Sequence, residues 1–228
     1  SLCEARGIQL RLDSAPEKVL GGKVVSGLQL ARRQTGGWQS SDRIDCDLIL
    51  VSGGWSPVVN LFSHRGIKPI WNPELACFLA PACEEAILAA GSAAGIWDHE
   101  ACANSGRDAA TQALQILENP SQIATVPVAG NWEGPIDPLY EVRTSGKKLK
   151  SFVDPQHDVT TDDIRLAQHE GYVSVEHLKR YTTLGMATDQ GKMGNIIGIA
   201  LMAEALGKEI PEVGTTTFRP PYTPISIG

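Results

Sequence analysis

An apolar run followed by a loop of small residues occurs twice in this chain, and this repeat most constrains the fold. The runs are residues 47–51 and 86–90, and the loops are residues 52–57 and 91–95. A continuous apolar run is expected of a strand buried on both faces of a parallel sheet, and loop glycines let the backbone approach a ligand closely. Because residues 98–117 then have helical periodicity, the second copy reads strand, loop, helix, an arrangement that commonly holds a dinucleotide pyrophosphate. We therefore predict an α/β fold that contains the closing half of a dinucleotide-binding domain. A single loop of this kind after a strand is as often purely structural as ligand-binding, and the chain has no Gly-x-Gly-x-x-Gly fingerprint.

Further patterns predict the remaining elements. Alternating apolar and polar residues predict strands at residues 8–12, 23–31 and 38–44. Helical patterns predict helices at residues 161–170, 174–183 and 189–206, with Thr160 or Thr161 and Ser174 as N-caps and a stop at Gly207. A stretch rich in Pro and Gly precedes these helices and marks a boundary. The predicted organisation is the C-terminal part of a dinucleotide-binding domain (1–120), a linker (121–150), a small helical domain (151–210) and an extended connector (211–228).

Composition limits the classes of partner. The net charge of −6 and the pI near 5.4 argue against nucleic acid, because phosphate backbones need a basic surface. The basic residues 147–150 are more typical of a solvated linker than of a binding patch. No apolar run has the length of a membrane span, so we expect no membrane association.

The cysteines and histidines do not form a recognisable catalytic or metal motif. The five cysteines include no CxxC pair, so small buried apolar positions are expected rather than a zinc or iron site, at Cys3, Cys46, Cys77, Cys83 and Cys102. Their odd number and the absence of a signal peptide predict a reducing cytoplasmic location. The spacing of His157, His169 and His177 does not place them on one helical face, and no Ser/His/Asp or Cys/His arrangement has local support. We expect neither a catalytic residue nor a metal ligand.

Residues 180–192 combine hydroxyls, amides, glycines and a lysine but contain no cysteine. Small helical modules that hold a 2Fe–2S cluster by thiolates carry a similar Gly-Met-x-x-x-Gln-Gly turn, with cysteines around it as iron ligands. Because those ligands are missing, the segment can keep the shape of such a module but cannot hold the cluster. Neutral donors and one ammonium group suit an anion such as phosphate.

Several long strings resemble the alpha subunits of heterotetrameric sarcosine oxidases. They are residues 44–59 (IDCDLILVSGGWSPVV), 89–95, 152–154, 174–192 (SVEHLKRYTTLGMATDQGK) and 214–224 (GTTTFRPPYTP). The resemblance implies a flavoprotein-like fold with two dinucleotide-binding domains that holds NAD, then a small three-helix domain related to the 2Fe–2S BFD-like module without its cluster. A folate-binding domain would follow. By this likeness the chain is a central fragment that begins after the NAD fingerprint and stops where the folate domain starts.

The resemblance also implies an activity and partners. The parent enzyme would demethylate sarcosine oxidatively to glycine, with formaldehyde or methylene-tetrahydrofolate and hydrogen peroxide as products. The chemistry would take place mainly on the flavin of the beta subunit, and gamma and delta subunits would complete the complex. FMN would lie between the alpha and beta subunits, with FAD and tetrahydrofolate elsewhere in the complex.

Two groups of residues are carried over from the family. The turn that closes over NAD would comprise Gly91, Ser92, Ala93, Trp97 and His99, with Ala15 and Pro16 near the adenosine. Packing under a helix start is an equally good explanation of Trp97 and His99. The FMN phosphate would face Thr182, Thr183, Thr188, Gln190 and Lys192, unless this turn is only a packed remnant of a lost cluster site.

Two other functions remain open. The alpha subunit of a related amino-acid or opine dehydrogenase would share both domains, but its helical module usually keeps the cluster cysteines. A structural or assembly module without catalytic function is the second alternative, since half a nucleotide site seldom binds well.

Overall fold

A computed structural model describes residues 2–82, 87–118, 136–144, 149–218, 223 and 225–226. The chain divides into two compact units, of which the first comprises Ser1–Gly53 with Leu139–Ser151 and the second Gly54–Pro138 with Phe152–Gly228. The chain passes between the units after Gly53, Pro138 and Ser151, and the last of these breaks lies within one residue of the predicted boundary after residue 150. The predicted helical domain and most of residues 54–118 therefore belong to one unit.

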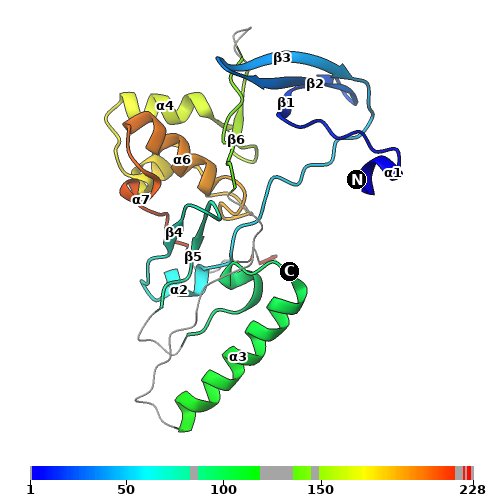
Figure 1. The fold of residues 1–228 in the computed structure, drawn as a ribbon. Coiled ribbons are helices and arrows are strands. Elements are labelled where there is room, and N and C mark those ends of the chain that lie inside the picture. Colours follow the sequence, from blue (N-terminus) through cyan, green and yellow to red (C-terminus); the bar gives the residue numbers. More distant parts are fainter. Residues whose placement is uncertain are drawn as a thin grey trace. The chain divides into compact units, whose positions relative to one another are not determined.

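The first unit is built on an antiparallel sheet with the order β1-β2-β3 (Figure 1). Its elements are α1 (Leu2–Ala5), β1 (Ser14–Gly21), β2 (Val25–Gln34) and β3 (Gly37–Ile44). A two-residue turn joins β2 to β3, and Gly37 has a φ of +116° where the third strand begins. The buried apolar residues of the sheet are Ala15, Leu30 and Ala31. Thr144 lies beside Trp38 and donates a hydrogen bond to Glu17 at 2.6 Å, which ties residues 139–151 to this unit.

The predicted strands at residues 23–31 and 38–44 are confirmed, apart from small differences at their ends, as β2 and β3. The predicted strand at residues 8–12 is wrong, because these residues are exposed and the first strand begins at Ser14. Strand β1 lies further along the chain and pairs with β2 from Ser14 to Gly21.

The predicted buried parallel strand at residues 47–51 is also wrong. Leu50 and Val51 are 86% and 83% exposed, and no strand is assigned there. Residues 87–90 likewise form no strand, and Ala86 lies outside the described residues. Every strand pair in the described part of the chain is antiparallel. An apolar run becomes a buried strand only when neighbouring strands accept and donate its backbone hydrogen bonds, and the described residues provide none.

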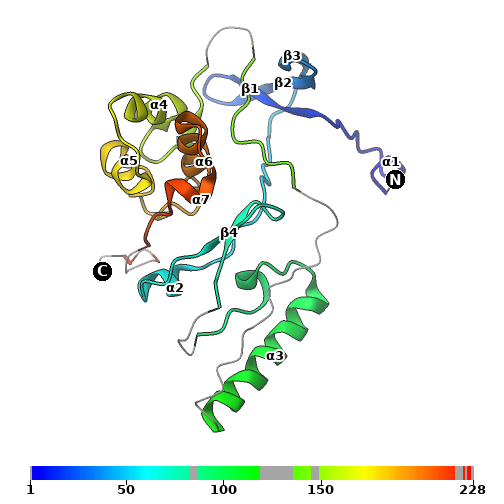
Figure 2. The same cartoon turned by 60° about the vertical axis from the view of Figure 1, so that its left-hand side comes forward.

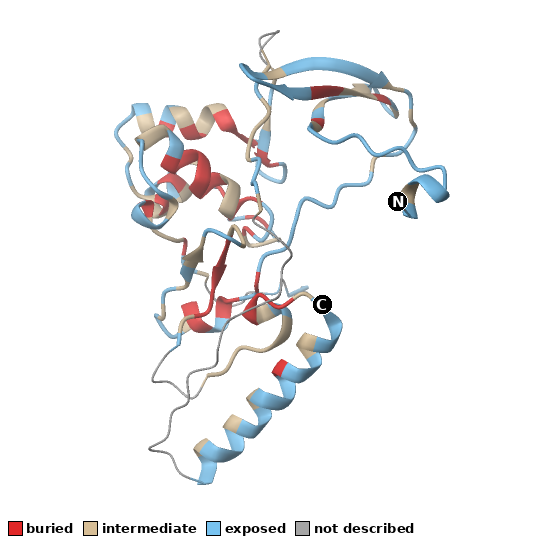
Figure 3. Ribbon diagram, viewed as in Figure 1, coloured by how far each residue is buried: buried red, intermediate tan, exposed pale blue. Residues whose placement is uncertain are grey.

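The second unit begins with a hairpin and a long helix. Its first elements are α2 (Asn60–His64), β4 (Ile70–Asn72), β5 (Cys77–Leu79), η1 (Gly91–Ala94) and α3 (His99–Glu118). Trp71 and Phe78 pair across the hairpin with their ring centroids 5.0 Å apart. The predicted helix at residues 98–117 is confirmed as α3. Ser105 is its one buried residue, and the remainder of the helix is exposed or half-buried (Figure 3).

The same unit contains the helical cluster that follows residue 151. Its elements are β6 (Phe152–Asp154), β7 (Val159–Thr160), α4 (Thr161–His169), α5 (Val175–Thr182), α6 (Asn195–Leu206) and α7 (Ile210–Val213). Helix α6 is apolar on nearly all sides, as expected of a fully buried helix, and it packs against α4, α5 and α7 (Figure 2). The small helical domain predicted from the sequence therefore forms around α6.

Local signals located the ends of these helices well. Thr160, one of the two predicted N-caps, caps α4 in a capping box with Asp163, and Gly207 ends α6 as predicted, with a φ of +63°. Ser174 occupies the N-cap position of α5, but its side chain makes no capping hydrogen bond.

Two predicted boundaries need correction. Helix α6 begins at Asn195 rather than at residue 189, because Gln190 and Gly191 have positive φ angles of +54° and +76° that interrupt a helix. The predicted connector from residue 211 is wrong at its start, where α7 continues to Val213. Residues 214–218 have no regular structure, and most of the remaining connector lies outside the described residues.

Candidate functional site

The turn between α5 and α6, residues 183–194, has few free donors. The backbone N–H groups of Gly191 and Met193 donate to the Asp189 carboxylate at 3.2 and 3.3 Å. The N–H of Gly185 donates to Asp154 at 3.0 Å. Much of the donor capacity of the turn is thus used to hold its own shape.

The predicted phosphate donors are engaged in the same way. The Thr182 hydroxyl donates to the carbonyl of Leu178 at 2.8 Å, and the Thr188 hydroxyl donates to Gln156 at 2.7 Å. The Thr183 hydroxyl and the Gln190 amide donate to backbone carbonyls. The five predicted residues therefore lie at the end of α5 and on the turn that follows it, and their neutral donors are mainly used in bonds within the protein. Lys192 is exposed on the same turn.

A polar hollow of about 210 Å³ lies beside this turn. Its walls come from α5 and from the turn, and they consist of Glu176, Lys179, Arg180, Gly185, Met186 and Gln190. The Arg180 guanidinium pairs with the Glu176 carboxylate at 3.3 Å, so the lining carries two cations against one anion. Gln190 was predicted from the sequence, whereas Lys179 and Arg180 were missed. Two consecutive basic residues in the last turn of a predicted helix, next to the cysteine-free segment, were the available signal.

The predicted NAD turn forms η1 and the start of α3. Gly91, Ser92 and Ala93 belong to η1, and the N–H of Gly91 donates to the Ser105 hydroxyl at 3.2 Å. The Asp98 carboxylate accepts a hydrogen bond at 2.8 Å from the N–H of Ala101. Because this carboxylate already occupies the positive end of α3, it competes with a phosphate for that position.

Tryptophans bring the two predicted small-residue loops together. The rings of Trp55 and Trp97 lie 6.0 Å apart between centroids, and Trp97 is half-buried while Trp55 is exposed. His99 is exposed at the start of α3, so packing beneath the helix does not explain it.

Ala15 and Pro16 belong to the other compact unit. Ala15 is buried in the face of the antiparallel sheet, opposite Ala31, and Pro16 is exposed on β1. These two residues therefore belong to the core and the surface of the sheet, and their place near the adenosine of NAD stays a prediction.

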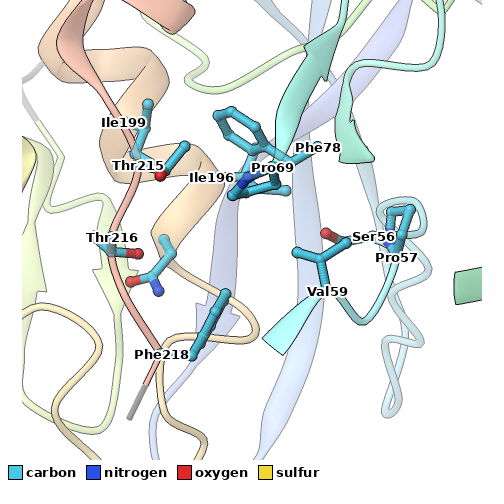
Figure 4. Close-up of a pocket in the computed structure, with 11 residues that line it drawn as sticks. Ser56, Pro57, Val59, Pro69, Phe78, Ile196, Ile199, Thr215, Thr216 and Phe218 are labelled. Atoms are coloured by element: carbon cyan, nitrogen blue, oxygen red, sulfur yellow. The ribbon is translucent and has the colours of Figure 1, made fainter. Parts of the chain in front are cut away.

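An apolar pocket is a further feature of the second unit (Figure 4). It encloses about 40 Å³ and is lined by Ser56, Pro57, Val59, Pro69, Phe78, Asn195, Ile196, Ile199, Thr215, Thr216 and Phe218. Asn195 is buried at 4% exposure, and neither of its amide atoms has a hydrogen-bond partner among the described residues. The sequence analysis did not single out this residue. An asparagine at the start of an otherwise apolar helix was the available signal.

The described residues hold no group of three or more His, Cys, Asp or Glu side chains arranged to bind a metal ion. His157 is tied to the turn by a hydrogen bond of 3.1 Å between its Nδ1 atom and the carbonyl oxygen of Thr183. Burial raises the pKa of the Cys77 thiol to about 11. Across the part of the chain that can be described, no helix is both long and apolar enough to cross a bilayer.

Comparison with known proteins gives matches over most of the chain. Residues 148–228 match the family model of the Sarcosine oxidase A3 domain. The sarcosine oxidase subunit alpha of Rhizobium meliloti (strain 1021) is 43% identical over 208 residues, which cover 91% of this chain and 21% of that protein. The subunit alpha of Corynebacterium sp. (strain P-1) is 35% identical over 191 residues, covering 81% of this chain and 20% of the relative. That of Corynebacterium sp. (strain U-96) is 36% identical over 198 residues, covering 82% and 20%.

A solved structure has the same fold. The crystal structure of L-proline dehydrogenase from P. horikoshii matches with a TM-score of 0.63 and 17% identity, over 93% of this chain and 43% of that chain. The fold is therefore one found in a dehydrogenase. The sequence matches assign the chain more narrowly, to the family of sarcosine oxidase alpha subunits. It spans about a fifth of the length of the curated relatives that it matches.

Proposed function

We propose that this chain serves as part of the alpha subunit of a sarcosine oxidase, which converts sarcosine oxidatively to glycine. The products would be formaldehyde or methylene-tetrahydrofolate and hydrogen peroxide, and beta, gamma and delta subunits would complete a cytoplasmic heterotetramer. The observation that carries the proposal is the 43% identity to such a subunit over 91% of this chain. Since no residue here is assigned a catalytic role, the chain would act by binding cofactors and forming an interface.

The hollow beside α5 is the proposed contact with FMN, and its lining suits a phosphate group. Lys179 and Arg180 supply positive charge, and Gln190 supplies an amide. Charge-assisted hydrogen bonds from such groups are the usual means of holding phosphate. The bound flavin would supply the oxidising chemistry, while α5 and the turn would position its phosphate.

This proposal changes the roles of the residues first predicted. The Thr182 and Thr183 hydroxyls already donate to backbone carbonyls of α5, and the Thr188 hydroxyl donates to Gln156, so these three would hold the turn in place rather than bind phosphate. Lys192, exposed on the turn, would add charge near the hollow.

The proposed contribution to NAD binding rests on the loop from Gly91 to His99. Trp97 with Trp55 would provide an aromatic surface for a ring of the cofactor, and the small residues Ser92 and Ala93 would allow close approach of its ribose. The Asp98 carboxylate at the start of α3 argues that the pyrophosphate lies elsewhere. FAD and tetrahydrofolate would bind to other parts of the complex.

Flavin content tests the proposal in the complete complex. Lys179→Ala combined with Arg180→Ala should lower the FMN that remains bound after gel filtration and weaken rebinding about tenfold or more, because two charge-assisted contacts are lost. Lys208→Ala, which removes an exposed lysine beyond the end of α6, is the matched control and should leave FMN unchanged. Lys192→Ala tests the turn separately. Unchanged FMN binding in the double variant and in Lys192→Ala would contradict the proposed contact.

Substrate oxidation distinguishes the alternatives. A related amino-acid or opine dehydrogenase subunit would assemble into a complex that oxidises proline or an opine in preference to sarcosine. A purely structural module would leave both cofactor contents and turnover unaffected by all of the substitutions above. Faster turnover of sarcosine with formation of hydrogen peroxide is the expected result.

A further inference from the structure

The Glu176 carboxylate is shared between Arg180 and the chain that follows α7. One of its oxygens lies 3.3 Å from the Arg180 guanidinium, one helical turn further along α5. The other oxygen accepts a hydrogen bond of 2.7 Å from the backbone N–H of Thr217. The guanidinium also donates to the backbone carbonyl of Glu176, at 3.0 Å. One residue therefore holds a cation of the polar hollow and, at the same time, a segment 41 positions away.

The two members of the ion pair differ in how firmly they are placed. The Glu176 side chain is 28% exposed and the Arg180 side chain is 53% exposed. Val175 and Leu178, which flank Glu176 on α5, are buried and fix the helix at this position. Thr217 follows the buried Thr216, so its N–H is also anchored. The carboxylate is thus held from both sides, and the exposed guanidinium is the partner that can turn towards a ligand.

Glu176 is also the negative group that a bound anion would meet. Among the described residues that line the polar hollow, it alone carries a negative charge, beside Lys179 and Arg180. A phosphate group in the hollow would repel this carboxylate and compete with it for the Arg180 guanidinium. An exposed ion pair within one helix is weak, whereas contacts between a guanidinium and a phosphate are strong and often bidentate. Exchange of the carboxylate for a phosphate is therefore favourable.

We propose that Glu176 is the resident counter-ion of the polar hollow and that an incoming phosphate group displaces it from Arg180. Before binding, the carboxylate holds the guanidinium at the hollow and lowers the affinity for anions by competition. During binding, the Thr217 N–H retains the displaced carboxylate on the side of the chain after α7, away from the phosphate. Glu176 is thus a positioning residue that sets the affinity of the site. The inference rests on the proposed function only in taking the ligand to be the phosphate of FMN.

A purely structural role for Glu176 makes the opposite prediction. If the carboxylate only stabilises α5 and fastens the chain after α7, its removal should loosen the hollow and weaken phosphate binding or leave it unchanged. If the carboxylate competes with the ligand, its removal should strengthen phosphate binding. The direction of the change separates the two roles.

The first experiment removes the charge and keeps the shape. The complete complex, prepared without FMN, is titrated with inorganic phosphate in a calorimeter at low salt. Glu176→Gln should bind phosphate about fivefold more tightly, because a negative charge a few ångströms from the ligand is lost and Arg180 is released. The gain should shrink as salt is added, since screening weakens this repulsion. Glu170→Gln, the same change at an exposed position outside the hollow lining, is the matched control and should leave the affinity unchanged.

The second experiment tests the bond from Thr217. Thr217→Pro removes the backbone N–H, whereas Thr217→Ala keeps it and serves as the control. Thr217→Pro should weaken phosphate binding about threefold, because the carboxylate then returns wholly to Arg180. Combined with Glu176→Gln it should have no such effect, as a double-mutant cycle would report. If Thr217→Pro does not assemble, the comparison of Glu176→Gln with Glu170→Gln decides.

The results that would overturn the inference are distinct from those that concern the FMN contact. Unchanged or weaker phosphate binding in Glu176→Gln, or no detectable phosphate binding in any of the proteins, would overturn the inference. If FMN is lost on replacing Lys179 and Arg180 while Glu176→Gln binds phosphate no more tightly, only the role of Glu176 fails. If Glu176→Gln binds phosphate more tightly while FMN is indifferent to Lys179 and Arg180, the inference stands and the FMN contact fails.

Discussion

The carboxylate of Asp154 accepts a hydrogen bond of 3.0 Å from the backbone N–H of Gly185, which lies 31 residues further along the chain. The other carboxylate oxygen accepts from the N–H of Gln156, also at 3.0 Å. Asp154 is buried, so both bonds are shielded from water. Strand β6 is therefore fastened to the cysteine-free turn, and the shape of the polar hollow depends on this contact.

Asp154→Ala should loosen the turn. The substitution leaves the buried N–H of Gly185 without its acceptor, which costs about 1–3 kcal/mol. Asp154→Asn should be milder if the amide oxygen faces Gly185. Hydrogen exchange of the backbone amides of residues 183–194 measures the local opening, with the amides of α3 as the internal control. Equal exchange in the wild type and in Asp154→Ala would show that the contact contributes little.

Gly191→Ala should destabilise the chain more than Gly207→Ala. Both residues have positive φ, which costs alanine about 1–2 kcal/mol. At Gly207 no atom lies within 4 Å of the added Cβ, whereas at Gly191 it would lie 2.2 Å from the Asn195 amide nitrogen. The overlap should add about 1–3 kcal/mol to the loss. Urea unfolding followed by circular dichroism compares the two variants, and equal losses would mean that the amide side chain simply moves aside.

Thr160→Ala and Ser174→Ala should differ although both residues are helix N-caps. The Thr160 side chain accepts from the N–H of Asp163 in a capping box, while the Ser174 side chain makes no capping bond. Thr160→Ala should therefore cost about 1 kcal/mol, and Ser174→Ala should cost little. Exchange rates of the first amides of α4 and α5 give the two values. A larger effect at Ser174 would contradict the observed capping geometry.

Cys77 should resist alkylation in the folded chain. Burial raises the pKa of its thiol from 9.0 to about 11, so its thiolate fraction near pH 8 is about a hundredfold lower than that of an ordinary cysteine. The half-buried Cys3, Cys46 and Cys102 should react with iodoacetamide first, as mass spectrometry of the peptides would report. Modification of Cys77 as early as the others at pH 8 would mean that its surroundings open readily.

The raised pKa of the Cys77 thiol also predicts how the stability of the folded chain changes with pH. Between about pH 9 and 11 the unfolded chain ionises at this thiol while the folded chain does not. The contribution of Cys77 to stability is therefore complete below pH 9 and decreases as the pH rises through this window. Replacing Cys77 with Ala should remove this part of the pH dependence in urea titrations.

The predictions that were confirmed depend on signals spread over only a few residues. The cap at Thr160 requires a partner three positions away, and the end of α6 requires a glycine that tolerates positive φ. Both can be read from the chain because hydrogen bonds and backbone angles within one turn decide them. The strand prediction at residues 47–51 failed because a strand needs partners that an apolar run does not specify.

The candidate sites show the same contrast between local sequence patterns and contacts made in the tertiary structure. The sequence alone identified the cysteine-free turn, its family resemblance and most of its helices, since these rest on residue identity and local pattern. Only the tertiary structure decided that the Thr182 and Thr188 hydroxyls donate to Leu178 and Gln156, and that Lys179 and Arg180 line the hollow. The pocket at Asn195 likewise joins positions from Ser56 to Phe218. Contacts across such distances arise when α6 is buried among its neighbours, and no local rule of sequence determines which side chains then meet.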